Sequence, residues 1–281
     1  MIKADVYFKT NLNDILQYGA YDENPRGKYL DGSPAHTEFI TQIFEKYDIN
    51  KGEFPITTLR NTAIKTGINE ILWIYQKQSN SISTAKEMGI HWWDNWDIGD
   101  GTIGKRYGYT VKKYKLIDNL LYNLKKYPFS RRHIINLYQE LDLMDGVGLY
   151  PCAFETIWSV RKERDWFKND NLYLDLTLIQ RSSDYIVSGY INKMQYVALL
   201  MMVASHLSYK VGVFSHFVQN LHLYDRHKDA ANEILNRTPL DVQPKLILNN
   251  QKSFYDISLN DFSIEGVEKI KKIDSKLELA I

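Results

Sequence analysis

The chain has 281 residues, of which 35 are Lys or Arg and 34 are Asp or Glu, so its formal net charge is +1. This balance excludes a strong long-range attraction to polyanions, so nucleic acid is a poor candidate partner on charge alone. The longest apolar run, at 196–204, is about half the length of a membrane-spanning helix, and a single cysteine excludes an intramolecular disulfide. Since the N-terminus has no apolar signal core, we expect a soluble cytoplasmic protein with no membrane segment, folded as a single domain over residues 1–281.

The first half of the chain is predicted to hold a surface loop and two helices. Residues 23–36 contain the Pro, Gly and Asp that are typical of a loop. Apolar residues then recur at helical spacing over 60–78 and again over 115–128, where Pro128 ends the pattern.

The second half is predicted to be mainly β, with one buried helix. Alternating or β-rich runs predict strands at 134–138, 153–161, 172–181, 212–224 and 244–249. Between them, 191–208 is nearly all apolar and predicts a buried helix. Strands and helices follow one another without the regular alternation of a doubly wound fold. We therefore expect an α+β fold, with a central mixed β-sheet covered by helices.

Two aromatic segments are candidates for ligand binding. The run HWWDNW at 91–96 places three tryptophans beside Asp and Asn, which favours a flat ring-binding wall over core packing alone. Further on, His222 and Tyr224 fall on the same side of a predicted strand. The polar ends of these two side chains could both hydrogen-bond to one sugar hydroxyl. A core histidine with its hydrogen bonds satisfied is the alternative.

Two basic motifs are suited to holding an anion. In SRRH, at 130–133, adjacent arginines enter a predicted strand on opposite sides, so we expect one of them to be buried against an anion such as phosphate. A surface salt bridge is the alternative. In QRSSD, at 180–184, Arg and Ser can hold a phosphate, and the Asp can accept hydrogen bonds from a heterocycle; a simple turn is the alternative.

The single cysteine, Cys152, lies between Pro151 and a predicted strand. Most free cysteines are buried and inert, so its position by itself favours a core residue. A thiol becomes a nucleophile where arginine or another cation lowers its pKa. Arg131, Arg132 and Arg181 are available for this, and their spacing does not show which of them lies near the sulfur.

Taken in order, these motifs resemble those of the thymidylate synthase family, folate-dependent methyltransferases that act on dUMP. The series comprises a Glu before ILW, a Trp-Asp-x-Trp run, YG, SRR, PC before a strand, QRSxD, an Asn eight residues later, and HLY. It extends from about Phe8 to the C-terminal LAI. The resemblance implies reductive methylation of dUMP to dTMP with 5,10-methylenetetrahydrofolate, release of dihydrofolate, no metal, and a homodimer formed through the sheet face.

The resemblance also implies roles for individual residues. Cys152 is the nucleophile that adds to C6 of uracil, Asn192 reads the uracil edge, and proton transfer falls to Glu70 and Tyr107. The nucleotide is held by Arg26, Arg181, Ser182, Asp184, His222 and Tyr224, together with Arg131 and Arg132 of the partner subunit. The folate pocket is formed by Trp93, Asp184, Ala280 and Ile281, whose terminal carboxylate closes over it.

Several segments depart from the common family pattern. The segment SGYIN at 188–192 lacks the usual proline, VQN replaces Gly-Gly-Asp at 218–220, and Ala153 stands where His is common. A dUMP hydroxymethylase is the nearest alternative within the superfamily, since Asn192 favours uracil over cytosine. Two alternatives lie outside the superfamily. A non-catalytic nucleotide- or RNA-binding protein would not need the thiol, and a cysteine hydrolase would not need the arginine clusters. The sequence does not show whether the protein binds its own mRNA.

Overall fold

The structure is a computed structural model that describes residues 1–164 and 170–280. Its centre is a six-stranded sheet with the order β1-β2-β6-β5-β4-β3. The strands are β1 (Ala20–Tyr21), β2 (Thr37–Asp48), β3 (Ile134–Asn136), β4 (Ala153–Arg164), β5 (Asp170–Asp184) and β6 (Lys210–Tyr224). β5 and β6 pair in parallel and the other neighbours are antiparallel. The sheet is therefore mixed, as expected.

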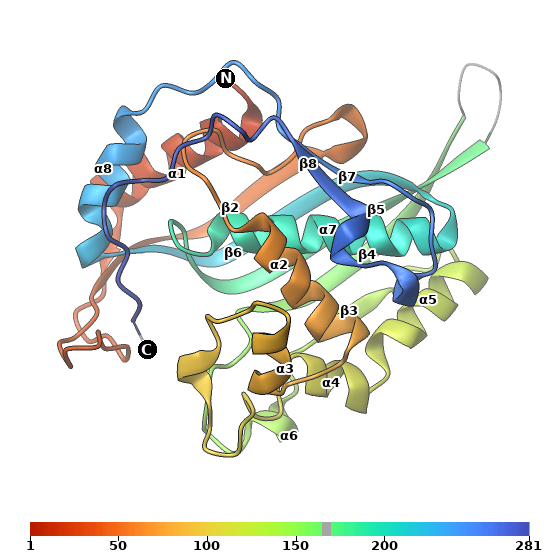
Figure 1. Cartoon of the computed structure of the whole chain (residues 1–281), viewed down its shortest axis with the longest axis horizontal. Coiled ribbons are helices and arrows are strands. Elements are labelled where there is room, and N and C mark those ends of the chain that lie inside the picture. The colour runs from red at the N-terminus through yellow and green to blue at the C-terminus, as the bar shows by residue number, and fades with distance from the viewer. Residues whose placement is uncertain (165–169, 281) are drawn as a thin grey trace.

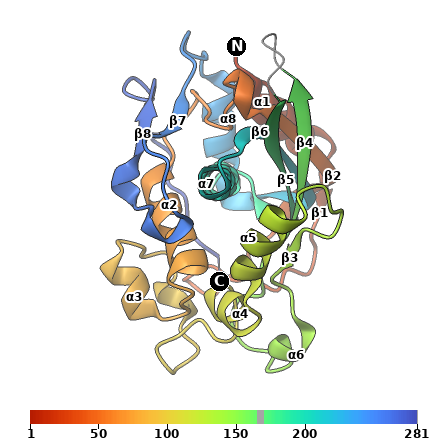
Figure 2. The same ribbon diagram turned by 90° about the vertical axis from the view of Figure 1, so that its right-hand side faces the viewer.

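Helices and a small second sheet pack against this central sheet. The second sheet is formed by β7 (Lys245–Leu248) and β8 (Phe262–Glu265). The helices are α1 (Lys3–Tyr18), α2 (Ile64–Ile71), α3 (Ile82–Glu87), α4 (Gly108–Lys113), α5 (Leu116–Lys126), α6 (Glu140–Leu143), α7 (Gly189–Leu207) and α8 (Lys228–Asn236). Figure 1 shows α7 running across the sheet, and Figure 2 shows it between the sheet and a layer that contains α2, β7 and β8. The predicted α+β class is confirmed.

The central helix α7 is buried on all sides, which explains its nearly uniform apolar sequence. Every residue from Lys193 to Ala204 is buried. On one side it meets α2 at Gly67, where an added Cβ would lie 3.1 Å from Ile191 Cγ2 and 3.2 Å from Gln195 Cγ. Glycine at this position therefore lets the two helices approach closely, with consequences for the site described below.

The remaining predicted elements are found, with shifted bounds. The helical pattern at 60–78 begins only at Ile64 and continues beyond α2 as a wider π-helical turn, Leu72–Gln76. The strand predicted at 134–138 is shortened to β3, and the strand predicted at 172–181 is lengthened to β5. On β5, Leu174, Leu176 and Leu178 are buried, as their alternation predicts. Within the described ranges, no helix combines the length and apolar character needed to cross a bilayer.

Candidate active site

A cavity of about 370 Å³ opens where β5 and β6 end. Because these strands are parallel and Asp184 aligns with His222, both strand ends deliver side chains to the same place. The sequence-predicted residues that line the cavity are Arg26, Glu70, Trp93, Tyr107, Cys152, Arg181, Ser182, Asp184, Asn192, His222, Tyr224 and Ala280. Segments that are far apart in the sequence therefore bring one thiol, two arginines and two carboxylates to a single cavity.

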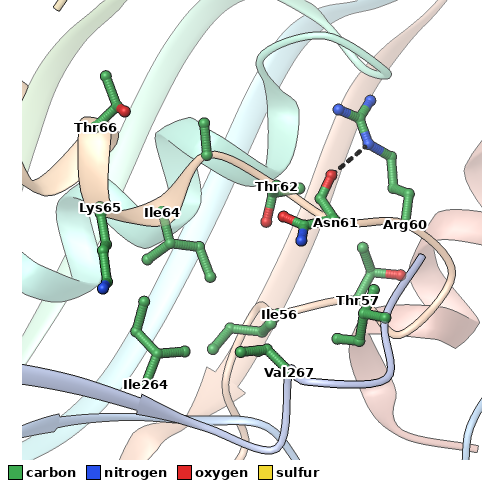
Figure 3. Close-up of a pocket in the computed structure, with 12 residues that line it drawn as sticks. Ile56, Thr57, Arg60, Asn61, Thr62, Ile64, Lys65, Thr66, Ile264 and Val267 are labelled. Carbon is green, nitrogen blue, oxygen red and sulfur yellow. Dashed lines mark hydrogen bonds between the residues drawn. The ribbon is translucent and has the colours of Figure 1, made fainter. Parts of the chain in front are cut away.

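A second cavity, of about 310 Å³, lies beside the loop that precedes α2 (Figure 3). Its walls include Ile56, Ile264 and Val267, and Arg60 lies at its edge. The Arg60 guanidinium donates to the backbone oxygen of Ile186, immediately before Val187 of the first cavity. None of the sequence-predicted site residues lines this second cavity, so the first is the candidate active site.

Cys152 is held beside Arg181 by the register of β4 and β5. The strands align Ala153 with Gln180, and the Arg181 backbone N–H donates to the Cys152 oxygen at 2.9 Å. The Arg181 guanidinium donates to the backbone oxygens of Pro151 and Tyr150 at 3.0 and 2.9 Å, which leaves its Nη2 3.4 Å from Cys152 Sγ. The protein backbone thus fixes a cation against the sulfur.

Arginine lowers the pKa of this thiol, as expected, but the net shift of the pKa is in the opposite direction. Burial raises the pKa of Cys152 above its ordinary value, and the charges of Arg181 and Arg26 offset that rise only in part. The part-buried sulfur is therefore mainly a thiol at neutral pH, and its reactivity depends on the fraction that loses its proton.

This balance predicts an alkylation profile shifted to high pH. We expect the rate of Cys152 modification by iodoacetamide to rise with pH, with a midpoint above that of a free thiol such as glutathione, because the thiolate is the reactive form. Arg26→Ala should move the midpoint further up, since it removes a cation that favours the thiolate. Arg164→Ala, an exposed arginine on β4, serves as the matched control and should leave it unchanged. A wild-type midpoint at or below that of glutathione would contradict the direction of the shift. Since the chain has one cysteine, the modified site is unambiguous.

Glu70 is a buried carboxylate at the end of α2. Its Oε1 accepts hydrogen bonds from the indole N–H groups of Trp92, at 3.1 Å, and Trp93, and its Oε2 accepts one from Gln195 Nε2. Burial raises the pKa of Glu70, and these three hydrogen bonds act against the rise. The three donors favour the ionised form of Glu70, and an ionised carboxylate can accept a proton, which suits a general base.

Tyr107 connects this carboxylate region to the cysteine. Its hydroxyl accepts a hydrogen bond from the Cys152 backbone N–H at 3.2 Å, and its ring packs edge-on against Trp93 with centroids 5.3 Å apart. Its backbone φ is 48°, a conformation that non-glycine residues adopt at a cost. The strained backbone and the two contacts fix the hydroxyl at the cavity wall.

Asn192, in the first turn of α7, is held by amides on both sides. Its Nδ2 donates to Gln195 Oε1 at 2.9 Å, and its Oδ1 accepts from Gln180 Nε2 at 3.1 Å. One N–H and one lone pair of the Asn192 amide stay available to a ligand in the cavity.

His222 and Tyr224 also line the cavity, with their rings edge-on and their centroids 5.3 Å apart. His222 Nδ1 lies 3.1 Å from Asn220 Oδ1 and 3.4 Å from Ser182 Oγ. Burial lowers the pKa of His222 and raises the pKa of Tyr224 to about 12. Both side chains are therefore neutral hydrogen-bonding groups at pH 7, as binding a hydroxyl requires.

Arg131 and Arg132 are not among the residues that line this cavity. Arg131 and Arg132 are both exposed, so the expectation that one of them is buried is wrong: the chain is still a loop at that point, because β3 begins only at Ile134. Ala280 lies at the cavity and forms a bridge with Tyr29. Ile281, predicted to close over the folate, lies outside the described residues.

Several residues that line the cavity were not singled out from the sequence. They are Trp92, Trp96, Gln180, Gln195 and Tyr196. Three of them lie inside motifs that were noted, the tryptophan run and QRSSD, whereas Gln195 is marked only by its spacing of three from Asn192 on a helix. Within residues 1–164 and 170–280, no group of three or more His, Cys, Asp or Glu side chains is arranged to hold a metal ion.

The chain is similar to known proteins along its whole length. The family model described as Thymidylate synthase matches residues 6–279. Two proteins named thymidylate synthase, from Lactococcus lactis subsp. cremoris and Streptococcus gordonii, are 49% and 46% identical to this chain, and each match covers 100% of both proteins. The solved structure of a thermostable thymidylate synthase A from Bacillus subtilis matches with a TM-score of 0.87 at 33% identity and covers 99% of both chains. The chain therefore belongs to the thymidylate synthase family.

Proposed function

We propose that the protein converts dUMP to dTMP with 5,10-methylenetetrahydrofolate through a covalent bond between Cys152 Sγ and C6 of uracil. The observation that carries this proposal is the convergence of Cys152, Arg181, Asn192 and Glu70 on one cavity. Family membership supports the reaction, and the geometry supports the assignment of its steps to residues.

The first step suits the cysteine. C6 of uracil is the far end of an unsaturated carbonyl, an acceptor that matches a soft sulfur nucleophile. The thiol first loses its proton to solvent, and the thiolate Sγ then bonds to C6. As that bond forms, the electrons of the C5–C6 double bond shift toward O4, and C5 becomes nucleophilic. The free N–H of Asn192 can donate to O4 as charge develops there, and its Oδ1 can accept from N3–H.

The remaining nucleotide groups match the other walls. Arg26 and Arg181 bring two positive charges to one side of the cavity and Ser182 adds a hydroxyl, which together suit the phosphate. Next to Ser182, His222 and its neighbour Tyr224 are neutral and suit the 3′-hydroxyl of the deoxyribose. The nucleotide would thus be held at both ends while C6 lies at the sulfur.

The folate fits the aromatic side of the cavity. Trp92, Trp93 and Trp96 offer flat apolar surface, Asp184 is available to accept a hydrogen bond, and Ala280 brings the C-terminal segment to the rim. When bound, methylenetetrahydrofolate supplies both the one-carbon unit and the hydride. Glu70 would take up the C5 proton through water, and closure of the C-terminal segment would keep other water from the reacting carbon.

We also propose a cytoplasmic homodimer that forms through the uncovered face of the sheet. Phe44, Phe217 and Ile179 align across β2, β6 and β5 on the face opposite to α7, and Phe44 is 54% exposed. An apolar row of this kind suits burial against a second copy. In such a dimer, the exposed Arg131 and Arg132 are available to reach the phosphate in the other subunit's cavity.

Product analysis tests the proposed reaction. Wild-type protein incubated with dUMP and methylenetetrahydrofolate should give dTMP and dihydrofolate in equal amounts, measured by mass spectrometry and absorbance. Hydroxymethyl-dUMP with tetrahydrofolate as the accompanying product would instead assign the chain to the hydroxymethylases, and no turnover would contradict both.

The base-reading role of Asn192 gives a specificity prediction. Asn192→Asp should shift relative affinity from dUMP toward dCMP by about tenfold or more, because a carboxyl group pairs better with the cytosine edge and each mismatched hydrogen bond costs about 1–3 kcal/mol. Dissociation constants for both nucleotides measure the shift. Asn249→Asp, on the exposed surface near β8, makes the same chemical change outside the cavity and is the control. An unchanged ratio in Asn192→Asp would remove this residue from base reading.

A further inference from the structure

A continuous row of buried side chains links His216 to Glu70. His216 Nε2 lies 2.9 Å from Gln180 Oε1, Gln180 Nε2 donates to Asn192 Oδ1 at 3.1 Å, and Asn192 Nδ2 donates to Gln195 Oε1 at 2.9 Å. Gln195 Nε2 then donates to Glu70 Oε2. Four of these side chains are nearly inaccessible, with Gln180 1%, His216 1%, Gln195 3% and Glu70 6% exposed. Water therefore cannot readily replace a lost partner in the row.

The Glu70 end of the row fixes its direction. An ionised carboxylate has no N–H and can only accept, so Gln195 must present Nε2 to Glu70 and Oε1 to Asn192. Asn192 must in turn present Nδ2 to Gln195 and Oδ1 to Gln180. A single flipped amide would place two donors or two acceptors against each other.

At the other end of the row, the backbone fixes Gln180, whereas the histidine imposes no direction. Gln180 Nε2 also donates to the Ser182 backbone oxygen at 2.9 Å, and a carbonyl oxygen can only accept. A neutral imidazole can present either a donor or an acceptor at Nε2, depending on its tautomer. Burial lowers the pKa of His216 well below its ordinary value, and its Nδ1 has no hydrogen-bond partner among the described residues. His216 by itself can therefore accommodate either orientation of Gln180, and the direction of the row is set by Glu70 at one end and by the Ser182 backbone oxygen at the other.

The close contact of α2 and α7 makes the link possible. Gly67 and Glu70 lie three residues apart on α2, and Asn192 and Gln195 lie three apart on α7, so each pair shares a helix face. Because Gly67 has no Cβ to displace the Gln195 side chain, a single glutamine spans the distance between the carboxylate and the Asn192 amide.

We propose that Gln195 is a positioning residue for the preference of uracil over cytosine. Because its NH₂ group donates to Glu70, its oxygen must accept from Asn192, and this holds the Asn192 amide in the orientation that matches uracil. This inference rests on the proposed function, in which Asn192 reads the base. Uracil presents an acceptor at O4 and a donor at N3, whereas cytosine presents the reverse pattern. With the row directed by Glu70 through Gln195 and by the Ser182 oxygen through Gln180, the Asn192 amide has one orientation, and cytosine cannot reverse it without unpairing both neighbouring glutamines.

Glu70→Gln provides the sharpest test, because it should reverse the amides of Gln195 and Asn192. The indole N–H groups of Trp92 and Trp93 only donate, so the new amide must turn its oxygen toward them and its NH₂ toward Gln195. Gln195 would then flip and Asn192 would flip with it, at the cost of the Gln180–Asn192 hydrogen bond, because the Ser182 backbone oxygen holds Gln180 in place. The ratio of dissociation constants for dCMP and dUMP, measured by calorimetry without folate, should fall by about tenfold or more, with tighter dCMP binding as part of the change.

Gln195→Leu tests the link itself. It removes both hydrogen bonds at similar volume, leaves Asn192 held only by Gln180, and should also lower the dCMP-to-dUMP ratio because one hydrogen bond fewer opposes a flip of Asn192. The double variant Glu70→Gln with Gln195→Leu should then give the same ratio as Gln195→Leu alone, because no hydrogen bond then connects position 70 to Asn192. Gln76→Leu is the matched control: it removes a glutamine amide that donates to the backbone oxygens of Phe254 and Ile257, away from the cavity, and should leave the ratio unchanged.

An unchanged ratio in Glu70→Gln would overturn the inference, even if Gln195→Leu failed to fold. So would equal effects of Glu70→Gln in the presence and absence of Gln195. Wild-type protein that methylates dUMP while both variants keep the wild-type ratio would refute only the role of Gln195. Wild-type protein that neither binds nor methylates dUMP would refute the proposed function instead.

Discussion

Cys152→Ala should lower turnover of dUMP by on the order of 10⁴-fold or more while leaving nucleotide binding measurable. The side chain loses only its sulfur, so the phosphate and sugar contacts proposed for Arg181, His222 and Tyr224 stay in place. Without that sulfur, C5 of the uracil is not activated, and no other step can compensate. The rate of dTMP formation and the dissociation constant for dUMP, measured on the same preparation, give the two halves of this prediction.

Ser188→Ala is the matched control, because it also removes one heavy atom from the wall of the same cavity. The Ser188 hydroxyl donates to the Asp184 backbone oxygen at 3.1 Å and has no part in the proposed chemistry, so its loss should change the rate only a few-fold. Methylation by Cys152→Ala within a hundredfold of wild type would show that another group is the nucleophile.

Mixing two inactive variants should restore activity if the site is shared between subunits. Arg131→Ala removes a phosphate contact from the partner's cavity, and Cys152→Ala disables the chain's own cavity. In a hybrid dimer, one cavity combines the intact Cys152 of one chain with the intact Arg131 of the other, while the second cavity lacks both. Random exchange of equal amounts makes half of the dimers hybrid, so about a quarter of the wild-type activity should return.

The control for this experiment uses Cys152→Ala mixed with the double variant Cys152→Ala, Arg131→Ala, which can form no intact cavity and should stay inactive. Analytical ultracentrifugation of differently tagged chains confirms that exchange has taken place. Exchange without recovery, or an Arg131→Ala protein with full activity by itself, would contradict a phosphate site completed by the second subunit.

The sequence predicted the elements whose patterns are uniform. The helix at 191–208 is apolar on all faces because it is buried on all faces, and the leucines of β5 alternate because one face of the strand packs inward. Helix α1 was not predicted, although Phe8, Leu12 and Ile15 recur at helical spacing between polar residues. Several of those residues have tertiary partners that a local pattern does not reveal, as Asn11 has in buried Glu45.

The site was predicted through the order of its motifs, and its electrostatics were not. No spacing rule shows that Arg181 lies beside Cys152, since that contact depends on the register of β4 and β5. The net pKa shift of the thiol depends on burial, which outweighs both arginines, and burial is a property of the assembled cavity. Gln195 was missed for the same reason: a glutamine in a helix has no signature until α2 brings Glu70 to it.

The most direct test of the account is incubation with 5-fluoro-dUMP and methylenetetrahydrofolate, followed by intact-protein and peptide mass spectrometry. Fluorine at C5 cannot be removed as a proton can, so the reaction should stop after Sγ has bonded to C6 and C5 has bonded to the one-carbon unit. The account predicts a protein whose mass is increased by both ligands, with the addition on the peptide that contains Cys152. A folded protein that binds both ligands and gives no covalent addition, or an addition on any other residue, would contradict it.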